Sequence, residues 1–130
     1  MIARYSLPEI TRIWRDENKY ALMLKVEILA VQAQVKLGNV PKSVVESIKK
    51  NAKFNIDNIK RIEEKTHHDV VAFITDVSKY IGKNARYFHV GLASSDVLDT
   101  ALSVQCVEAA DILLKRLKEL TGIVYRKARE

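Results

Sequence analysis

Apolar residues recur at intervals of three and four along almost the whole chain, a spacing that is typical of amphipathic α-helices. No stretch alternates apolar and polar residues as a half-buried β-strand would. Only four glycines and two prolines interrupt the pattern over 130 residues. The pattern therefore predicts an all-α protein, with a loop over residues 83–93 and helices near residues 6–15, 17–37, 41–51, 54–64, 67–81 and 94–130.

Two of the predicted helix starts carry residues that commonly cap helices. Ser6 stands before Pro8, with Glu9 three residues later, which favours a serine N-cap and a proline in the first turn. Asp16 is placed to cap the helix predicted over residues 17–37. That helix has two adjacent apolar stripes, so we expect it to be buried between several neighbours. The stripes comprise Leu22, Val26, Leu29, Ala33 and Leu37, and Leu24, Ile28, Val31 and Val35.

Two histidines lie at the start of the helix predicted over residues 67–81, which we expect to end at a glycine. Thr66 and Asp69 have the Thr-x-x-Asp spacing of a capping box, which would place His67 and His68 in the first turn. The positive end of a helix dipole disfavours a protonated imidazole, so both rings are expected to be neutral. Neutral rings can hydrogen-bond a ligand or accept a proton, although histidines in capping turns are more often simply polar residues.

The last predicted helix is too long and too apolar for a protein of this size. A continuous helix from residue 94 or 95 to residue 130 would be about 50 Å long, whereas a compact domain of this length is about 30 Å across. Its apolar residues lie on more than one side, among them Leu98, Leu102, Leu113 and Leu117. We therefore expect part of a helix bundle whose partners lie outside this sequence, in an obligate oligomer or in a longer chain.

Composition and charge are those of an ordinary globular protein. Hydrophobic residues make up 48% of the chain and charged residues 29%, so intrinsic disorder is not expected. The net charge of +6 favours a negatively charged ligand. The basic doublets are scattered, and we predict no nucleic-acid partner, because such a partner requires basic residues on one face. The lack of a long apolar run predicts no membrane span, and the absence of a secretory signal or cysteine pairs predicts a cytoplasmic protein.

Neither a metal site nor a reactive cysteine is expected. His67, His68, Asp69 and His89 have no established zinc-ligand spacing, and the sequence has no CxxC motif. Cys106 lies among apolar residues, so we expect a buried packing residue and not a nucleophile.

Two other segments could bind an anion. Residues 91–96 form a small-residue loop before a helix, where free N–H groups and the hydroxyls of Ser94 and Ser95 suit a carboxylate or phosphate. Arg4 and Tyr5 offer a guanidinium and a phenol, which suit a phosphate. The simpler alternatives are that one of the serines caps the helix while the following aspartate complements its dipole, and that Arg4 and Tyr5 are an ordinary surface pair.

Three blocks of residues occur in order over nearly the whole chain. The first is Arg4-Tyr5-Ser6-x-Pro8-Glu9, continued by Ile13-Trp14-x-Asp16-Glu17-Asn18 and Val26-Glu27-Ile28-Leu29-Ala30. The second is His68-Asp69-Val70-Val71-Ala72-Phe73, and the third is His89-x-Gly91-Leu92-x-Ser94-Ser95-Asp96-Val97-x-Asp99-Thr100-Ala101. Together these blocks closely resemble the start of bacterial and archaeal adenylosuccinate lyases, which belong to the fumarase/aspartase superfamily.

The resemblance implies an all-α homotetramer. In that superfamily a small N-terminal helical domain precedes a central domain of long helices. The long helices of four subunits form the tetramer core, and each active site contains segments of three subunits. On this basis residues 1–93 would form the N-terminal helical domain, and residues 94–130 would form the first long helix of the central bundle, in truncated form.

The resemblance also implies a reaction. Adenylosuccinate lyases eliminate fumarate from adenylosuccinate to leave AMP, and they act in the same way on succinyl-aminoimidazole carboxamide ribotide in purine biosynthesis. A base removes a proton from the succinyl carbon beside a carboxylate, an acid protonates the departing nitrogen, and no cofactor is needed. The substrate carries a phosphate and two carboxylates, which agrees with the positive charge of the chain.

The matched blocks imply roles for particular residues. His68 would orient or assist the acid near the bond that breaks, beside Asp69. Ser94 would help to hold a succinyl carboxylate at the helix N-terminus. The resemblance thus implies one catalytic residue, His68, and six residues that bind substrate, namely Arg4 and Tyr5 at its phosphate, Asp69, His89, Ser94 and Ser95.

Two positions depart from the usual motifs, and two motifs are absent. Ala93 stands where the family usually has threonine, so a hydroxyl contact is missing or comes from Ser95, and His67 replaces the usual arginine. The 130 residues include neither the Gly-Arg-Thr-His block with the general-acid histidine nor the Gly-Ser-Ser-x-Met-Pro loop with the catalytic serine. We therefore expect the N-terminal part of such a lyase, inactive by itself.

Two other functions are compatible with the residue pattern alone. The chain could be a non-catalytic helical interaction module that associates through its long apolar helix, or a basic helical protein that binds nucleic acid. A Gly-Arg-Thr-His block downstream would distinguish a lyase from an interaction module, and steep salt dependence of binding would identify a nucleic-acid binder.

Overall fold

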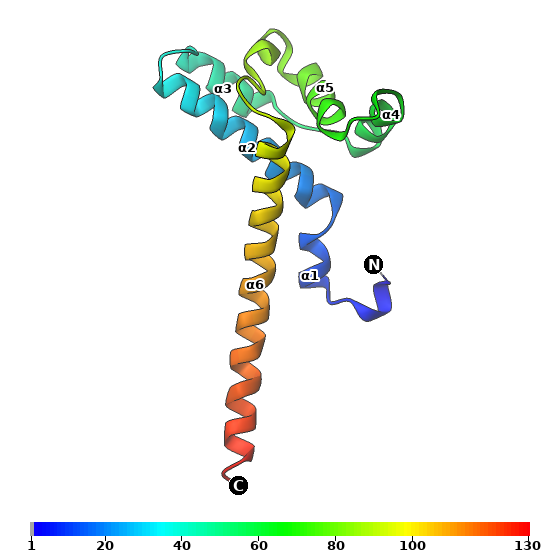
Figure 1. Cartoon of the computed structure of the whole chain (residues 1–130), viewed down its shortest axis with the longest axis vertical. Coiled ribbons are helices and arrows are strands. Elements are labelled where there is room, and N and C mark those ends of the chain that lie inside the picture. Colours follow the sequence, from blue (N-terminus) through cyan, green and yellow to red (C-terminus); the bar gives the residue numbers. More distant parts are fainter. Residues whose placement is uncertain (1) are drawn as a thin grey trace.

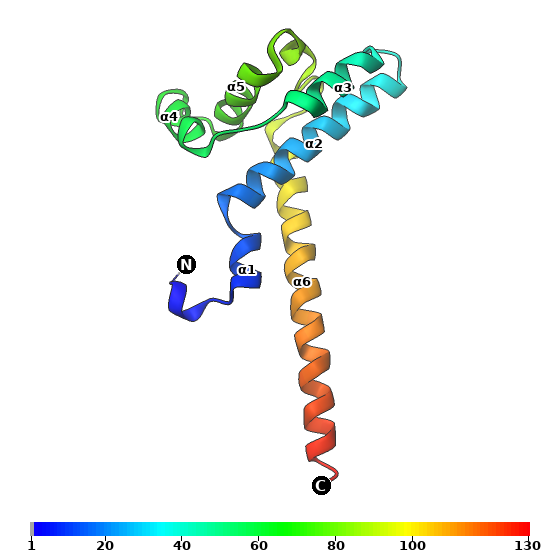
Figure 2. The same cartoon turned by 180° about the vertical axis from the view of Figure 1, so that it is seen from behind.

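The computed structural model describes residues 2–130, and every regular element in that range is a helix, which confirms the predicted all-α class. Helices α2 to α5 form a head, and one long helix, α6, projects from it with α1 at its side (Figures 1 and 2). In chain order the elements are the 3₁₀ helix η1 (Ala3–Tyr5), α1 (Pro8–Ile13), α2 (Asp16–Lys36), α3 (Lys42–Asn51), α4 (Ile56–Thr66), α5 (Asp69–Ile81), the 3₁₀ helix η2 (Gly82–Tyr87) and α6 (Ser94–Lys127).

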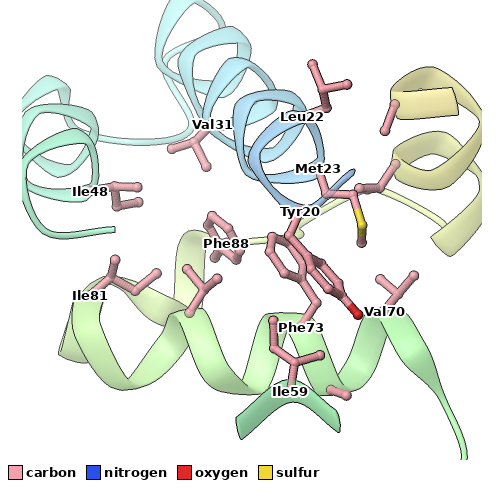
Figure 3. Close-up of a cluster of buried hydrophobic side chains, with 14 of the residues drawn as sticks. Tyr20, Leu22, Met23, Val31, Ile48, Ile59, Val70, Phe73, Ile81 and Phe88 are labelled. Carbon is pink, nitrogen blue, oxygen red and sulfur yellow. The ribbon is translucent and has the colours of Figure 1, made fainter. Parts of the chain in front are cut away.

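Helix α2 supplies one side of the core of the head, and α5 supplies the opposite side (Figure 3). The ring of Tyr20 on α2 stacks on that of Phe73 on α5, with centroids 5.7 Å apart and planes inclined by 14°. Met23 and Val31, further along α2, are at most 2% exposed. Burial of the phenol raises the pKa of Tyr20 to about 12. The core therefore contains a titratable group whose charged form it disfavours.

The apolar surface of α2 is covered only in part, which differs from the expectation of burial between several neighbours. Leu29 is 52% exposed and Leu37 is 71% exposed. Helices α3 and α6 pack against α2, but the last three residues of the first predicted stripe, Leu29, Ala33 and Leu37, stay exposed. The buried residues of α2 are Tyr20, Leu22, Met23, Glu27 and Val31.

A buried carboxylate joins the start of α4 to α5. Asp76 of α5 is fully buried, and its Oδ2 accepts the backbone N–H of Asn55 at 2.7 Å. The side-chain amide of Asn58 donates to the other oxygen of Asp76. Asn55 is also the N-cap of α4, because its side chain accepts the N–H of Asn58 at 2.9 Å. Two donors thus satisfy a charge that would be costly to bury alone, and they hold the N-terminus of α4 on α5.

Two predicted N-caps are wrong, and one predicted helix end is confirmed. The N-cap of α1 is Leu7, and the hydroxyl of Ser6 donates to a backbone carbonyl four residues earlier at 3.2 Å. The N-cap of α2 is Arg15, and Asp16 is the first helical residue, where a carboxylate still complements the dipole. Gly82 ends α5 as predicted, with a φ of 56° that glycine adopts at little cost. The segment predicted as a loop after it begins with η2.

Helix α6 runs unbroken over 34 residues, which is about 51 Å at about 1.5 Å per residue and confirms the predicted long helix. Its only buried residues are Val97, Ala101 and Gln105, all within its first turns. The side-chain amide of Gln105 donates to the carbonyl of Ile13 at 2.6 Å, which ties α6 to the end of α1. The guanidinium of Arg116 pairs with Glu9 of α1 at 3.0 Å, so the middle of α6 runs beside α1, and its last turns project beyond α1 (Figure 1).

The second half of α6 exposes a regular row of apolar side chains, which we call the α6 seam. It consists of Leu113, Leu117, Leu120 and Val124, whose spacings of four, three and four are those of a coiled-coil seam. These side chains are 55 to 62% exposed. As predicted, the helix has more apolar surface than the rest of the chain covers.

The first residue of α6 coincides with the predicted boundary between residues 1–93 and 94–130. Val97 and Ala101 nevertheless belong to the core of the head, where they are at most 1% exposed. The first turns of α6 are therefore packed as part of the head. The division of the chain into two domains at this position stays a prediction.

Candidate functional site

His68 is the N-cap of α5, and its ring is fixed by the first turn of that helix. Its Nδ1 accepts the backbone N–H of Val71 at 3.4 Å, which places the proton of the neutral ring on Nε2. The carboxylate of Asp69 is 3.7 Å from Nδ1 and accepts the N–H of Val70 at 2.7 Å. The side chain of His68 is 46% exposed. His68 thus offers an N–H donor to the exterior, beside a carboxylate.

The capping box predicted from Thr66 and Asp69 is not formed, and the two histidines do not lie in the first turn of α5. Thr66 is the last residue of α4, and its hydroxyl donates to the carbonyl of His68 at 3.3 Å. His67 ends α4 in the left-handed conformation, with a φ of 51°. Helix α4 extends two residues further than predicted, so the residue expected to cap α5 completes the preceding helix.

His89 is held by Glu27, a residue to which the sequence analysis gave no role. Glu27 lies on α2 and is fully buried. One of its oxygens is 2.6 Å from Nδ1 of His89, and the other accepts the backbone N–H of His89 at 3.0 Å. Burial raises the pKa of Glu27, while its hydrogen bonds with His89 act in the opposite direction. A carboxylate on the apolar face of α2, between Val26 and Ile28, was the available signal, because such a group requires a partner.

Ser94 and Ser95 lie in the first turn of α6, but neither caps it. The N-cap is Ala93, and its backbone N–H donates to the carboxylate of Asp96 at 2.7 Å. The hydroxyls of both serines have no protein partner among residues 2–130. The predicted serine cap is therefore wrong, and both hydroxyls are free at the N-terminus of a long helix, where an anion is favoured.

Arg4 and Tyr5 lie in η1, apart from the other candidate residues. The guanidinium of Arg4 stands over the ring of Tyr5, 4.8 Å from its centroid. Tyr5 is 74% exposed. Both views show η1 at the far side of α1, away from the head that carries His68 and His89 (Figures 1 and 2). The pair is therefore available to a ligand, but not within one pocket shared with those histidines.

Four cavities of the described chain lie away from the predicted site residues. Cavities of about 530, 580, 410 and 200 Å³ are present. The first is lined by Arg15 and residues of α2 and α4, and the second by α4 and His67. The third is lined by the end of α6, and the fourth by α2 and α6. None of the four is lined by any of the seven predicted site residues.

Other chemistry is limited in this part of the chain. Residues 2–130 contain no group of three or more His, Cys, Asp or Glu side chains that could hold a metal ion. Over the same range no helix combines the length and the hydropathy that a bilayer crossing needs. Cys106 is exposed, which corrects the expectation of a buried residue. It lies on the side of α6 that the rest of the chain leaves uncovered.

The arrangement of long and short helices matches a known class of enzyme. The model of a family described as Lyase matches residues 3–130, and the chain therefore belongs to this lyase family. The fold is also similar to that in the crystal structure of fumarate lyase from Mesorhizobium sp. BNC1. That likeness has a TM-score of 0.77 at 17% identity and covers 84% of this chain and 26% of that chain.

The relatives are more specific than the family. Adenylosuccinate lyase of Thermotoga maritima is 48% identical over 98% of this chain. The adenylosuccinate lyases of Bacillus subtilis and Synechocystis sp. are 48% and 45% identical over 100% of it. The chain spans 30% of the length of each of these relatives. These matches confirm the resemblance that the three sequence blocks indicated.

Proposed function

We propose that the chain is the N-terminal part of an adenylosuccinate lyase. The whole enzyme would eliminate fumarate from adenylosuccinate to give AMP, and from succinyl-aminoimidazole carboxamide ribotide, in the cytoplasm and without a cofactor. The observation that carries the proposal is the identity of 45 to 48%, over 98 to 100% of the chain, with three proteins that bear this name.

The local geometry supports the proposed roles of the residues near the head. His68 presents an N–H next to the carboxylate of Asp69, as a group that orients or assists the acid would. Ser94 and Ser95 present free hydroxyls at the start of α6, where a succinyl carboxylate would gain from the helix dipole. His89 would bind the substrate through the ring nitrogen that Glu27 leaves free.

Assembly would complete this site. Arg4 and Tyr5 would hold the substrate phosphate, yet they lie apart from the head, and the α6 seam is uncovered. Both observations support a homotetramer in which long helices pack together and each active site takes residues from several subunits. The remaining proton-transfer groups would come from the part of the enzyme that follows these 130 residues.

A non-catalytic interaction module is a second candidate, and the exposed α6 seam favours it. Such a module would use the same helix to associate. It gives no role to the carboxylate-held His89, to the free hydroxyls of Ser94 and Ser95, or to the three matched blocks. The two candidates differ in whether these residues matter once the rest of a lyase is supplied.

The deciding experiment is a chimera in which residues 1–130 replace the matching segment of the Bacillus subtilis adenylosuccinate lyase. We expect the purified chimera to release fumarate from adenylosuccinate. His68→Asn should then lower kcat/KM at least about tenfold, because positioned acid–base groups contribute about 10² to 10⁴. Asparagine is among the best N-cap residues, so the start of α5 and the thermal melting curve should be preserved.

The matched control is His67→Asn, which removes a neighbouring imidazole at a left-handed position that asparagine tolerates. We expect this variant to keep the activity of the chimera. A folded tetrameric chimera without activity would contradict the lyase proposal. A fully active His68→Asn chimera would leave that proposal standing and would remove the catalytic role of His68.

A further inference from the structure

Glu27 and Asp76 are the two carboxylates that the described chain buries completely. Asp76 serves the start of α4. Glu27 has a different partner, because both of its oxygens bind a single residue, His89, which lies 62 positions away in the sequence. A buried carboxylate is stabilised by hydrogen-bond donors, and here the backbone and the ring of one histidine supply them.

The backbone conformation of His89 also indicates that the fold holds this residue in one defined orientation. Its φ is 62°, in the left-handed region that is unfavourable for a residue with a side chain. The N–H of this left-handed residue donates to Oε2 of Glu27 at 3.0 Å. The ring Nδ1 lies 2.6 Å from Oε1 of the same carboxylate. Rotation of the ring or relaxation of the backbone would therefore break a hydrogen bond to a buried charge.

The contacts of His89 leave only one ring nitrogen for a ligand. Oε2 of Glu27 accepts the backbone N–H, and an ionised carboxylate can only accept at Oε1 as well. Beside a charged Glu27, the ring Nδ1 therefore carries a proton. Nε2 has no hydrogen-bond partner among residues 2–130, and no side-chain polar atom in that range is both buried and unpartnered. Nε2 is therefore the nitrogen that reaches the surface.

We propose that Glu27 is a positioning residue that holds His89 with Nδ1–H directed inward and Nε2 presented to the substrate. In the neutral ring Nε2 is then an acceptor. The ring of His68 is set the opposite way, with Nδ1 accepting and Nε2–H directed outward. The fold thus supplies one imidazole donor and one imidazole acceptor. The assignment rests on the proposed function, because only there does His89 meet a substrate.

The first test reads the tautomer directly and needs no activity. In the 130-residue chain with ¹⁵N-labelled histidine at neutral pH, we expect the spectrum of His89 to show a protonated Nδ1. In Glu27→Gln the amide oxygen can accept only the backbone N–H, and the amide N–H₂ must face the ring. The proton of His89 should then move to Nε2. The matched control is Glu17→Gln, at an exposed position on the same helix, and it should leave the tautomer unchanged.

Each result of that test decides the proposal. A wild-type His89 protonated on Nε2, or a tautomer that is the same in Glu27→Gln as in the wild type, would overturn it. The wild-type spectrum decides even if Glu27→Gln does not fold. Glu27→Asp provides the conservative variant, because the shorter carboxylate still accepts and should keep Nδ1 protonated.

The second test is kinetic and uses the active chimera. Glu27→Gln should raise KM about tenfold, the effect of losing one well-placed hydrogen bond to a charged group, with kcat within about threefold. In a His89→Gln background the same substitution should change KM no further, because Glu27 acts through His89. Additive effects would overturn the proposal. If the unsubstituted chimera is inactive, the proposed function fails. The tautomer measured in the first test still shows whether Glu27 fixes the orientation of the His89 ring.

Discussion

The α6 seam predicts that the chain self-associates, and the exposure of its leucines sets the size of the effect. Leu113 is 62% exposed and Leu117 is 59% exposed. Full burial of a leucine is worth about 1.5 to 3 kcal/mol, so covering the exposed part of each is worth about 1 to 2 kcal/mol. Across two paired copies the four leucines contribute about 4 to 8 kcal/mol, which offsets much of the cost of association, about 4 to 15 kcal/mol.

The double variant Leu113→Lys, Leu117→Lys removes this contribution and places two charges in the seam. We expect the dissociation constant to rise at least about 10³-fold, the equivalent of about 4 kcal/mol. Sedimentation velocity at tens of micromolar should show the wild type associated and the variant monomeric. Asp111→Lys is the matched control, because it changes the net charge by the same two units on the opposite side of the helix, and it should still associate.

Hydrogen exchange measured on the same samples completes the test. In the double variant the head should keep its protection, because its core includes no residue of the seam. A wild-type chain that is monomeric while α6 is protected along its whole length would refute the reasoning. A monomer with rapid exchange beyond residue 105 would also contradict self-association, and would mean that α6 is ordered only by other parts of a longer enzyme.

Two further predictions concern activity and pH. The isolated chain, freed of host enzyme, should release no fumarate from adenylosuccinate above background, because its 130 residues lack the two motifs to which the resemblance assigns proton transfer. Release in proportion to chain concentration would contradict this. Tyr20 has a folded pKa of about 12 against 10.0, so stability is full below pH 10 and falls as pH rises through 12, by about 1.4 kcal/mol at pH 11. Urea titrations at pH 9 and 11 should show this loss removed in Tyr20→Phe and kept in Tyr125→Phe, whose ring is 59% exposed.

The helices could be predicted from the sequence because each is specified by periodic residues that lie close together in the chain. The apolar spacing predicted the class and the unbroken α6, and an excess of apolar surface predicted that α6 is uncovered. The same reasoning placed Cys106 in a core, which was wrong. Its apolar neighbours on α6 are themselves exposed, so an apolar neighbourhood in the sequence did not mean burial in this chain.

The capping predictions failed because a capping motif is local while a helix boundary depends on its surroundings. Thr66 has the spacing of a cap, but α4 continues through it. Ser94 and Ser95 follow the true N-cap, and the carboxylate of Asp96 binds the N–H of Ala93 from within the helix. A residue that could cap a helix does so only if the helix begins directly after it.

The sequence proposed residues for the candidate site, but it did not predict the contacts that hold them. The matched motifs pointed to His68 and His89, whose roles stay predictions. The contact of Glu27 with His89 spans 62 positions, so the sequence could show only that a carboxylate on the apolar face of α2 needs a partner, and not which partner. Only the folded chain brings α2 beside the segment before α6. Arg4 and Tyr5 lie apart from the head in one copy of the chain, so the motif that they share with the family does not by itself place them beside the histidines.

Val97 and Ala101, the residues that α6 contributes to the core of the head, have a consequence for the order of synthesis. A ribosome releases the chain from its N-terminus at about 5 to 20 residues per second, so all other helices of the head are made before these two residues complete its core. The seam leucines follow, from residue 113 onward. The exposed leucines of the seam are therefore translated only after every residue of the core of the head has been made.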